Sequence, residues 1–332
     1  MSLFKKVMLL SFVLFQTILL SSCGDGIGRA IPKIDLIPIK SGDVMGYINT
    51  KGDIIIAPQF KQAAVFNDGI ALVQSMGKDP KWGYIDKKGS YVINPQYKYA
   101  TSFSEGLAWA TVDHSAPTAI NESGQVQFVL SNANDVRIYK NGMAAFCVVG
   151  DNWKEQWGFV DRDGKIVIKP QFSEVLFFND DNQCLVRNNN GKWGAIDKEG
   201  KPVINFQFDS ASYSSINSRV FIVHKPESGF GVIDGSGKFI INPQYDNIIP
   251  DGKNFLVILN GKWGWVDGNG KIIINPQFSG ASQFLDNALA PIKLGDKWGY
   301  INKEGKIVIN PQFDKALPFN NSVALISISF TT

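Results

Sequence analysis

KWGYINKEGKIVINPQF, residues 297–313, occurs twice more in nearly the same form, as KWGYIDKKGSYVINPQY at 81–97 and KWGWVDGNGKIIINPQF at 262–278. Aligned on the residue that follows the tryptophan, the chain contains eight copies, spaced 33 to 40 residues apart. The reference positions are Gly46, Gly83, Thr118, Gly158, Gly194, Gly231, Gly264 and Gly299. A fixed period of this length indicates a solenoid, a propeller or another array of repeats.

Each copy contains the signature of a β-hairpin. A β-branched residue stands two places after the reference position, an Asp or Asn comes next, and a glycine follows three residues later in all eight copies. The Asp or Asn residues are Asn49, Asp86, Asn121, Asp161, Asp197, Asp234, Asp267 and Asn302. Their side chains bond to the nearby backbone and so open a tight turn, and the glycine supplies a left-handed residue. Two apolar strands joined in this way predict a hairpin.

The same turn could be read as half of a calcium loop, because Asp161 and Asp163 precede a glycine. Calcium loops need several carboxylates. Here Asp exchanges with Asn between the copies, and lysines such as Lys87 and Lys198 stand inside the loop. We therefore interpret the motif as a turn.

Two further segments complete each copy. The hairpin is followed by Asn-Pro-Gln-Phe in most copies, and the proline is expected to end the strand because it cannot donate to a ladder. A strand such as 69–73 comes next. We therefore expect three strands in each copy, with the short Pro-Gln-Phe segment as a fourth. No stretch after residue 35 has sustained helical periodicity, which predicts an all-β fold of tandem hairpins.

These strands are apolar on both faces, so both faces must be covered by neighbouring copies. Small sheets stacked side by side satisfy this, which favours a β-propeller of seven to eight blades. The alternative is an open β-solenoid or superhelical stack. Terminal strands at 36–39 and 323–326 give nine copies of one strand for eight hairpins, which suits ring closure or capping equally. The third copy has Pro117-Thr118 for Trp-Gly and should be the least well packed or the one modified for use.

The pattern resembles the WG-repeat (KWG-repeat) family over essentially the whole chain beyond its N-terminal segment. The resemblance implies one repeat domain over residues 35–330. It implies an architecture and no defined activity.

The N-terminus is predicted to be a lipoprotein signal peptide over residues 1–22. Lys5 and Lys6 precede an apolar run over 7–20, whose fourteen residues span about 21 Å as a helix. That length is too short for the ~30 Å hydrocarbon core. The alternative is an ordinary secretory signal.

Leu20-Ser21-Ser22-Cys23 resembles the lipobox of bacterial lipoproteins, which implies that Cys23 carries the lipid (such as palmitate) and begins the mature chain. Residues 23–34 would then form a flexible tether. We expect a lipid-anchored protein of the cell envelope. Gly24 in place of Asp favours the outer membrane in a cell with two membranes, by resemblance to enterobacterial sorting.

The composition excludes several classes of function. The net charge is +3, which gives no footprint for nucleic acid. Cys147 and Cys184 fall at non-matching places in consecutive copies, so we expect both to be buried and unpaired. The sequence contains no zinc, Walker, redox or hydrolase motif. We therefore predict no catalytic residue, no cofactor and no metal.

The loops before the hairpins vary most, at 75–80, 113–116, 150–156 and 225–228. Trp153 stands among polar residues in one of them and could contact a ligand, or fold back onto the neighbouring sheet. His114 is the second tentative ligand residue, or an incidental loop residue. The leading hypothesis is a non-enzymatic scaffold that binds a protein or a cell-surface glycan. The alternatives are a structural or assembly spacer and, less favoured, a propeller hydrolase.

Overall fold

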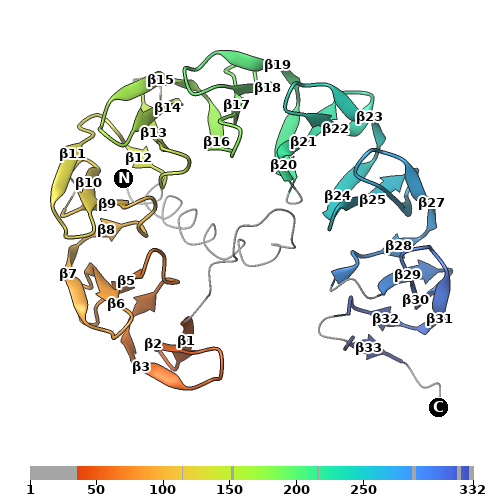
Figure 1. The fold of residues 1–332 in the computed structure, drawn as a ribbon, viewed down its shortest axis with the longest axis horizontal. Coiled ribbons are helices and arrows are strands. Elements are labelled where there is room, and N and C mark those ends of the chain that lie inside the picture. The colour runs from red at the N-terminus through yellow and green to blue at the C-terminus, as the bar shows by residue number, and fades with distance from the viewer. Residues whose placement is uncertain are drawn as a thin grey trace. The chain divides into compact units, whose positions relative to one another are not determined.

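The computed structural model describes residues 36–113, 115–150, 153–214, 217–285, 289–319 and 323–328. Within these ranges the chain forms strands and turns without an α-helix (Figure 1). No helix in this part of the chain is long and apolar enough to cross a membrane. The predicted signal peptide, tether and Cys23, together with His114, lie outside the described residues.

The strands form small antiparallel sheets in chain order, numbered here as sheets 1 to 8 after the eight copies. Sheet 1 contains β1 (Ile37–Ser41), β2 (Val44–Ile48) and β3 (Ile54–Phe60). Sheet 2 contains β4 (Gln62–Ala63), β5 (Ile70–Gln74), β6 (Trp82–Asp86) and β7 (Tyr91–Tyr97). Sheet 3 contains β8 (Tyr99–Ala100), β9 (Leu107–Thr111), β10 (Thr118–Asn121) and β11 (Val126–Val129). Sheet 4 contains β12 (Asp135–Val136), β13 (Met143–Val149), β14 (Glu155–Asp161) and β15 (Ile166–Phe172).

The later sheets have the same order of strands. Sheet 5 contains β16 (Glu174–Phe178), β17 (Cys184–Arg187), β18 (Trp193–Ile196) and β19 (Pro202–Phe208). Sheet 6 contains β20 (Ser210–Ser214), β21 (Asn217–Lys225), β22 (Gly229–Asp234) and β23 (Phe239–Tyr245). Sheet 7 contains β24 (Asn247–Asp251), β25 (Asn254–Leu259), β26 (Lys262–Val266) and β27 (Ile272–Phe278). Sheet 8 contains β28 (Gly280–Ala281), β29 (Ala290–Leu294), β30 (Lys297–Ile301) and β31 (Ile307–Phe313), and β32 (Lys315–Ala316) pairs with β33 (Ile326–Ser327).

The chain divides into two compact units. The described part of the N-terminal unit lies within Pro32–Ser212, together with the turn Gly235–Lys238. The described part of the C-terminal unit lies within Tyr213–Asp234 and Phe239–Thr332.

Within the N-terminal unit, consecutive sheets from sheet 1 to sheet 5 bury apolar faces against each other. Tyr84 and Ile93 of sheet 2 pack with Phe103 and Ile120, whereas Ile85 joins a cluster with residues of sheet 1. Sheets 3 and 4 share another cluster, and so do sheets 4 and 5. The C-terminal unit repeats this arrangement between the strands of sheets 6 and 7 and between sheets 7 and 8. The prediction that neighbouring copies cover the two faces is confirmed.

The Asx turns form as predicted. In sheet 2 the backbone N–H groups of Lys88 and Ser90 each donate to Asp86 Oδ1 at 2.9 Å, and Gly89 has a φ of 85°. Equivalent pairs of bonds occur at Asn49, Asn121, Asp161, Asp197 and Asp267. The side chain thus holds the turn with two backbone donors.

The turn glycine also meets the preceding sheet. A Cβ on Gly89 would lie 3.1 Å from Ile56 of sheet 1, and one on Gly305 would lie 3.1 Å from Ile274 of sheet 7. Gly124, Gly200, Gly237 and Gly270 meet an isoleucine in the same way, whereas Gly164 meets Phe128 of sheet 3.

The prediction that proline ends the strand is wrong. The outer strands continue through it, as in β7, where the register with β6 shifts between Trp82 and Tyr84. An outer strand has a free edge, so a missing N–H is tolerated there. The fourth strand is not Pro-Gln-Phe but the short segment after it, such as β8.

The register shift between Trp82 and Tyr84 is a β-bulge in β7, and it explains why the residue after the tryptophan is glycine. A Cβ on Gly83 would lie 2.7 Å from Ile93 O and 2.7 Å from Pro95 N, both backbone atoms. Sheet 3 lacks the bulge at that point, since Thr118 pairs with Val129 and Ala119 with Phe128. The room left there admits the Thr118 side chain.

The third copy is altered without being poorly packed. Ala119 stands where sheets 1 and 2 place Tyr47 and Tyr84. Trp109 on β9 is 2% exposed and stacks on Tyr139, with ring centroids 5.7 Å apart. A large ring supplied by the adjacent strand thus compensates for the small residue.

Candidate functional site

The sheets differ most in amino-acid sequence at the end where the Trp-Gly hairpins begin. In each sheet, the strand before the Trp-Gly strand places one residue opposite the Trp position. The identity of this residue varies between the sheets, and we call the set of these residues the variable row. The pairs are Lys40–Met45, Gln74–Trp82, Cys147–Trp157, Arg187–Trp193, His224–Phe230, Ile258–Trp263 and Lys293–Trp298. The loops of variable sequence follow directly, so this loop end is the part of each sheet that differs most between copies.

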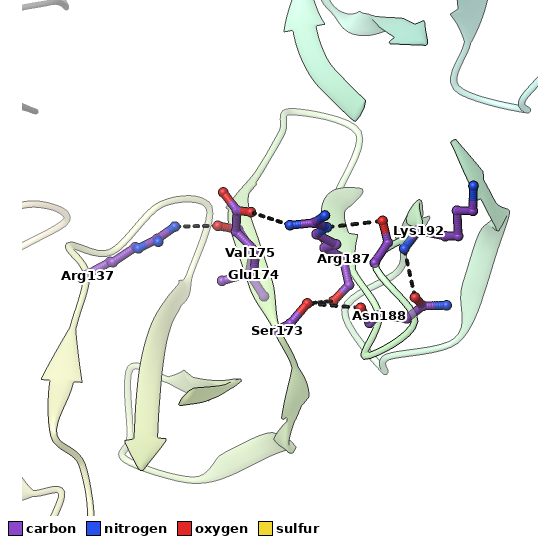
Figure 2. A network of polar contacts seen from close by, with 8 residues as sticks. Arg137, Ser173, Glu174, Val175, Arg187, Asn188 and Lys192 are labelled. Atoms are coloured by element: carbon purple, nitrogen blue, oxygen red, sulfur yellow. Dashed lines mark hydrogen bonds and ion pairs between the residues drawn. The ribbon is translucent and has the colours of Figure 1, made fainter. Parts of the chain in front are cut away.

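Sheets 4 and 5 join through a polar network at the seam between them, shown in Figure 2. Arg137 follows β12, donates from Nη1 to the carbonyl oxygen of Val175 on β16, and places its guanidinium 4.3 Å from the ring centroid of Trp157. Burial lowers the pKa of Arg137, and the Asp135 carboxylate opposes that shift. The hydrogen bond therefore links the two sheets, and the cation–π contact holds the guanidinium against Trp157 within sheet 4.

The other side of the network fixes the loop between β17 and β18. Arg187 donates from Nε to Gly191 O at 3.1 Å, and its Nη1 lies 3.9 Å from Glu174 Oε2. Ser173 Oγ donates to Asn188 O at 2.9 Å, and Lys192 N donates to Asn188 Oδ1 at 2.9 Å. These bonds hold the loop Asn188–Lys192 in one conformation.

Removing the Arg137 guanidinium should loosen this seam. We expect Arg137→Met to lower the free energy of unfolding by about 1–2 kcal/mol, because a charge-assisted hydrogen bond and a cation–π contact are lost. Urea unfolding monitored by circular dichroism measures the change. Arg187→Met is the matched control, with an expected loss below about 1 kcal/mol, because its ion pair is long and exposed and its bond to Gly191 O lies within one hairpin of sheet 5. Equal losses in both variants would contradict the role of Arg137.

Trp153 lies at the tip of the hairpin between β13 and β14 and is 87% exposed. Its backbone has a φ of 59°, a left-handed conformation that is unusual for a bulky residue. Gly150 N donates to Lys154 O, and Trp153 N donates to Gly150 O. In the next sheet the same pattern joins Asn188, Gly191 and Lys192, so Trp153 occupies the position of Gly191. The indole does not fold back onto a neighbouring sheet.

Side-chain amides connect this hairpin to the loop of sheet 5. Gln156 Nε2 donates to Asn189 Oδ1 at 3.1 Å, and Asn189 Nδ2 donates to Gln156 Oε1 at 3.4 Å. The variable loops of sheets 4 and 5 therefore meet at this end of the seam.

The second histidine belongs to the other compact unit, and both cysteines lie in the core that sheets 4 and 5 share. His224 on β21 packs against Phe230, with ring centroids 4.7 Å apart. Cys147 and Cys184 are free and buried, as predicted. Burial raises the pKa of Cys147 to about 11, with Glu155 and Asp135 adding to the shift, and burial also raises the pKa of Cys184. Both thiols are poor nucleophiles at neutral pH.

A hollow of about 390 Å³ lies at the opposite, Asx-turn end of sheets 3 and 4. Leu107, Gln127, Arg162 and Asp163 line it. In the part of the chain that the structure covers, no three His, Cys, Asp or Glu side chains are grouped to hold a metal ion.

Sequence reasoning missed Arg137, Glu174 and Arg187. The place of Arg137 after the short fourth strand is taken in sheets 2 and 3 by Ala64 and Thr101, whose backbone bonds are equivalent. An alignment of that strand would have singled out the arginine. The sequence prediction placed the fourth strand at the Pro-Gln-Phe segment, so the strand before Arg137 was not aligned.

A family model described as "WG containing repeat" matches residues 45–78, 82–113, 157–193, 193–218, 230–262, 263–298 and 298–328. These segments cover more than half of the chain. The chain is a WG-repeat protein. Residues 114–156, which contain the irregular third hairpin and Trp153, lie between matched WG repeats. No curated relative is found at significant similarity.

Solved structures resemble this WG-repeat protein in fold. A eukaryotic initiation factor is 12% identical, with a TM-score of 0.56 and coverage of 84% of this chain and 85% of that chain. BamB from Moraxella catarrhalis is 11% identical, with a TM-score of 0.39 and coverage of 82% and 92%. The designed protein Ika8 is 10% identical, with a TM-score of 0.38 and coverage of 80% and 92%. The neighbours include propeller-like structures, and the all-β prediction is confirmed, whereas ring closure stays a prediction.

Proposed function

We propose that this protein is a lipid-anchored scaffold of the cell envelope, on which WG-repeat sheets present a non-enzymatic binding surface for a protein or a glycan. The anchor would be Cys23, behind the signal peptide of residues 1–22 and ahead of the tether of residues 23–34. The outer membrane is the favoured location in a cell with two membranes.

The main support is the contrast between the positions that repeat in sequence from copy to copy and the positions that do not. The buried residues and Asx turns repeat from sheet to sheet, as Asp86 and Asp267 illustrate. The variable row and the loops beside it do not repeat. Repeat proteins that bind ligands place such variation on one face of a constant framework. A scaffold whose differences gather at one end of its sheets is suited to recognition.

Two alternative functions, a structural spacer and a propeller hydrolase, would require different features of the structure. A structural spacer would use the sheets only for length and would bind nothing at their loop ends. A propeller hydrolase would need carboxylates gathered in a channel. The hollow beside Leu107 has Asp163 as its one lining carboxylate and Arg162 beside it, which is not an acid–base pair.

Capture from envelope extracts tests recognition. The full chain, immobilised through a C-terminal tag, should retain the same component in repeated experiments. A spacer should retain nothing reproducibly. Turnover of a hydrolase substrate library by the purified chain would favour the third function over the proposal.

The anchor has its own test. In bacteria grown with labelled palmitate, the wild-type chain should incorporate label and Cys23→Ala should incorporate none, because the thiol that carries the acyl chain is removed. Ser22→Ala keeps a small residue before the cysteine and serves as the matched control. Label retained in Cys23→Ala would contradict the anchor.

A further inference from the structure

We propose that the loop ends of sheets 4 and 5 form a carbohydrate-binding site. The Trp153 indole would stack on the C–H face of a sugar ring, and the amides of Gln156 and Asn189 would bind its hydroxyl groups. The inference rests on the proposed binding function and adds to it a ligand class and a defined surface.

The conformation of Trp153 is the first support. A left-handed backbone disfavours a bulky side chain, and this cost is normally offset by packing. With 87% of its surface exposed, Trp153 gains little from packing. Glycine serves at the equivalent position of the next sheet, Gly191, so the hairpin does not need an indole. An exposed, strained tryptophan without a structural benefit indicates selection for contact with something else.

The amides beside it supply the polar half of the site. Each side-chain amide has two N–H donors and two acceptor lone pairs. Gln156 Nε2 donates to Glu155 O at 3.0 Å and to Asn189 Oδ1, so Gln156 keeps acceptor capacity, and Asn189 keeps one N–H donor and acceptor capacity. Asn189 also lies in a loop that Ser173 and Lys192 hold in place through Asn188. A fixed loop loses little conformational entropy when a ligand binds.

The surroundings favour a sugar over a protein. The centres of protein interfaces are depleted in charged residues, and their aromatic anchors sit in well-packed pockets. Trp153 is instead followed by the exposed residues Lys154 and Glu155. Nearby charges are matched, as in the pairs Glu174–Arg187 and Lys192–Asp209. An uncharged, hydroxyl-rich ligand with an apolar ring face fits this chemistry.

The test is affinity electrophoresis of the full chain through gels that contain dextran, laminarin, xylan or galactomannan, joined by co-sedimentation with insoluble peptidoglycan. At least one polysaccharide should retard or retain the wild-type chain. Trp153→Ala should weaken that binding about tenfold, since aromatic contacts contribute on this scale. Asn189→Ala should weaken it to a smaller extent. Met76→Ala, which removes another exposed apolar side chain from a variable loop, should bind normally.

Trp153→Gly separates recognition from folding. Glycine relieves the left-handed strain, so its melting temperature should rise by about 2–4 °C while binding weakens about tenfold, as in Trp153→Ala. Normal binding by Trp153→Ala, or a lower melting temperature for Trp153→Gly, would overturn the site. If no polysaccharide binds, the carbohydrate assignment fails. Reproducible capture of an envelope protein would then leave the broader proposed function standing, whereas capture of nothing would remove both.

Discussion

Gly83→Ala should destabilise the protein by about 3 kcal/mol or more, although it adds only one methyl group. That methyl would lie 2.7 Å from Ile93 O and from Pro95 N, and 2.9 Å from Pro95 Cα. All three are backbone atoms, so no side chain can rotate away, and the bulge of β7 must shift to relieve the overlap. Overpacking of this kind commonly costs about 1–3 kcal/mol and more where the surroundings are rigid. Urea unfolding of the full chain measures the loss.

The irregular third copy supplies the control. Thr118 occupies the position equivalent to Gly83, and its strand pairs with β11 without the bulge at that point. Thr118→Ala should cost less than about 1 kcal/mol, mainly through its hydroxyl bond to Ala116 O at 3.2 Å. If Gly83→Ala were as mild as Thr118→Ala, close approach of the bulge would not explain the glycine.

Asp251→Ala should cost about 2–5 kcal/mol, because it leaves one buried and one partly buried donor without an acceptor. Trp265 Nε1 donates to Asp251 Oδ2 at 2.7 Å, and Phe284 N donates to Oδ1 at 3.0 Å. An unpaired buried donor costs about 1–3 kcal/mol. Asp246→Ala is the control, since that exposed carboxylate receives Gly261 N at 2.9 Å, and its loss should stay below about 1 kcal/mol. Thermal and urea unfolding should rank the two variants in this order.

The same carboxylate gives stability a defined pH dependence. Burial raises the pKa of Asp251 above its ordinary value of 3.8, while bonds from Trp265 and Phe284 and the charge of Lys303 oppose the shift. The folded chain therefore holds this proton to a higher pH than the unfolded chain does. Its contribution to stability is greatest below about pH 3.8 and falls as pH rises through the folded pKa. Asp251→Asn should remove this fall. If the difference in unfolding free energy between the wild type and Asp251→Asn were the same at every pH from 3 to 7, the prediction would be contradicted.

The repeat alignment was sufficient to predict the hairpins, their turns and the mutual covering of sheets. Asp86 and Gly89 illustrate why: a turn depends on a few adjacent residues, and eight copies show which of them are required. The path through Pro95 was mispredicted, because tolerance for proline depends on whether the strand has a free edge. That property belongs to the sheet and not to the local sequence.

The candidate site was only half predictable. Trp153 stood out by composition, but the sequence does not show its exposure or its left-handed backbone, which a bulky residue seldom adopts. The partners of Arg137 lie in a different copy, since Val175 is 38 residues further along the chain. A periodic pattern shows what the copies share. The seam network consists of residues at which sheets 4 and 5 differ from the other copies.

The way each turn rests on the sheet before it also bears on how such a chain evolves. Gly89 meets Ile56 just as Gly305 meets Ile274, so most junctions use the same matching pair, although Gly164 of sheet 4 meets Phe128 instead. An in-frame duplication or deletion of one copy would create a junction with the fit already present elsewhere. Copy number is therefore free to change through recombination while the packing rules stay intact, and selection acts on the loops.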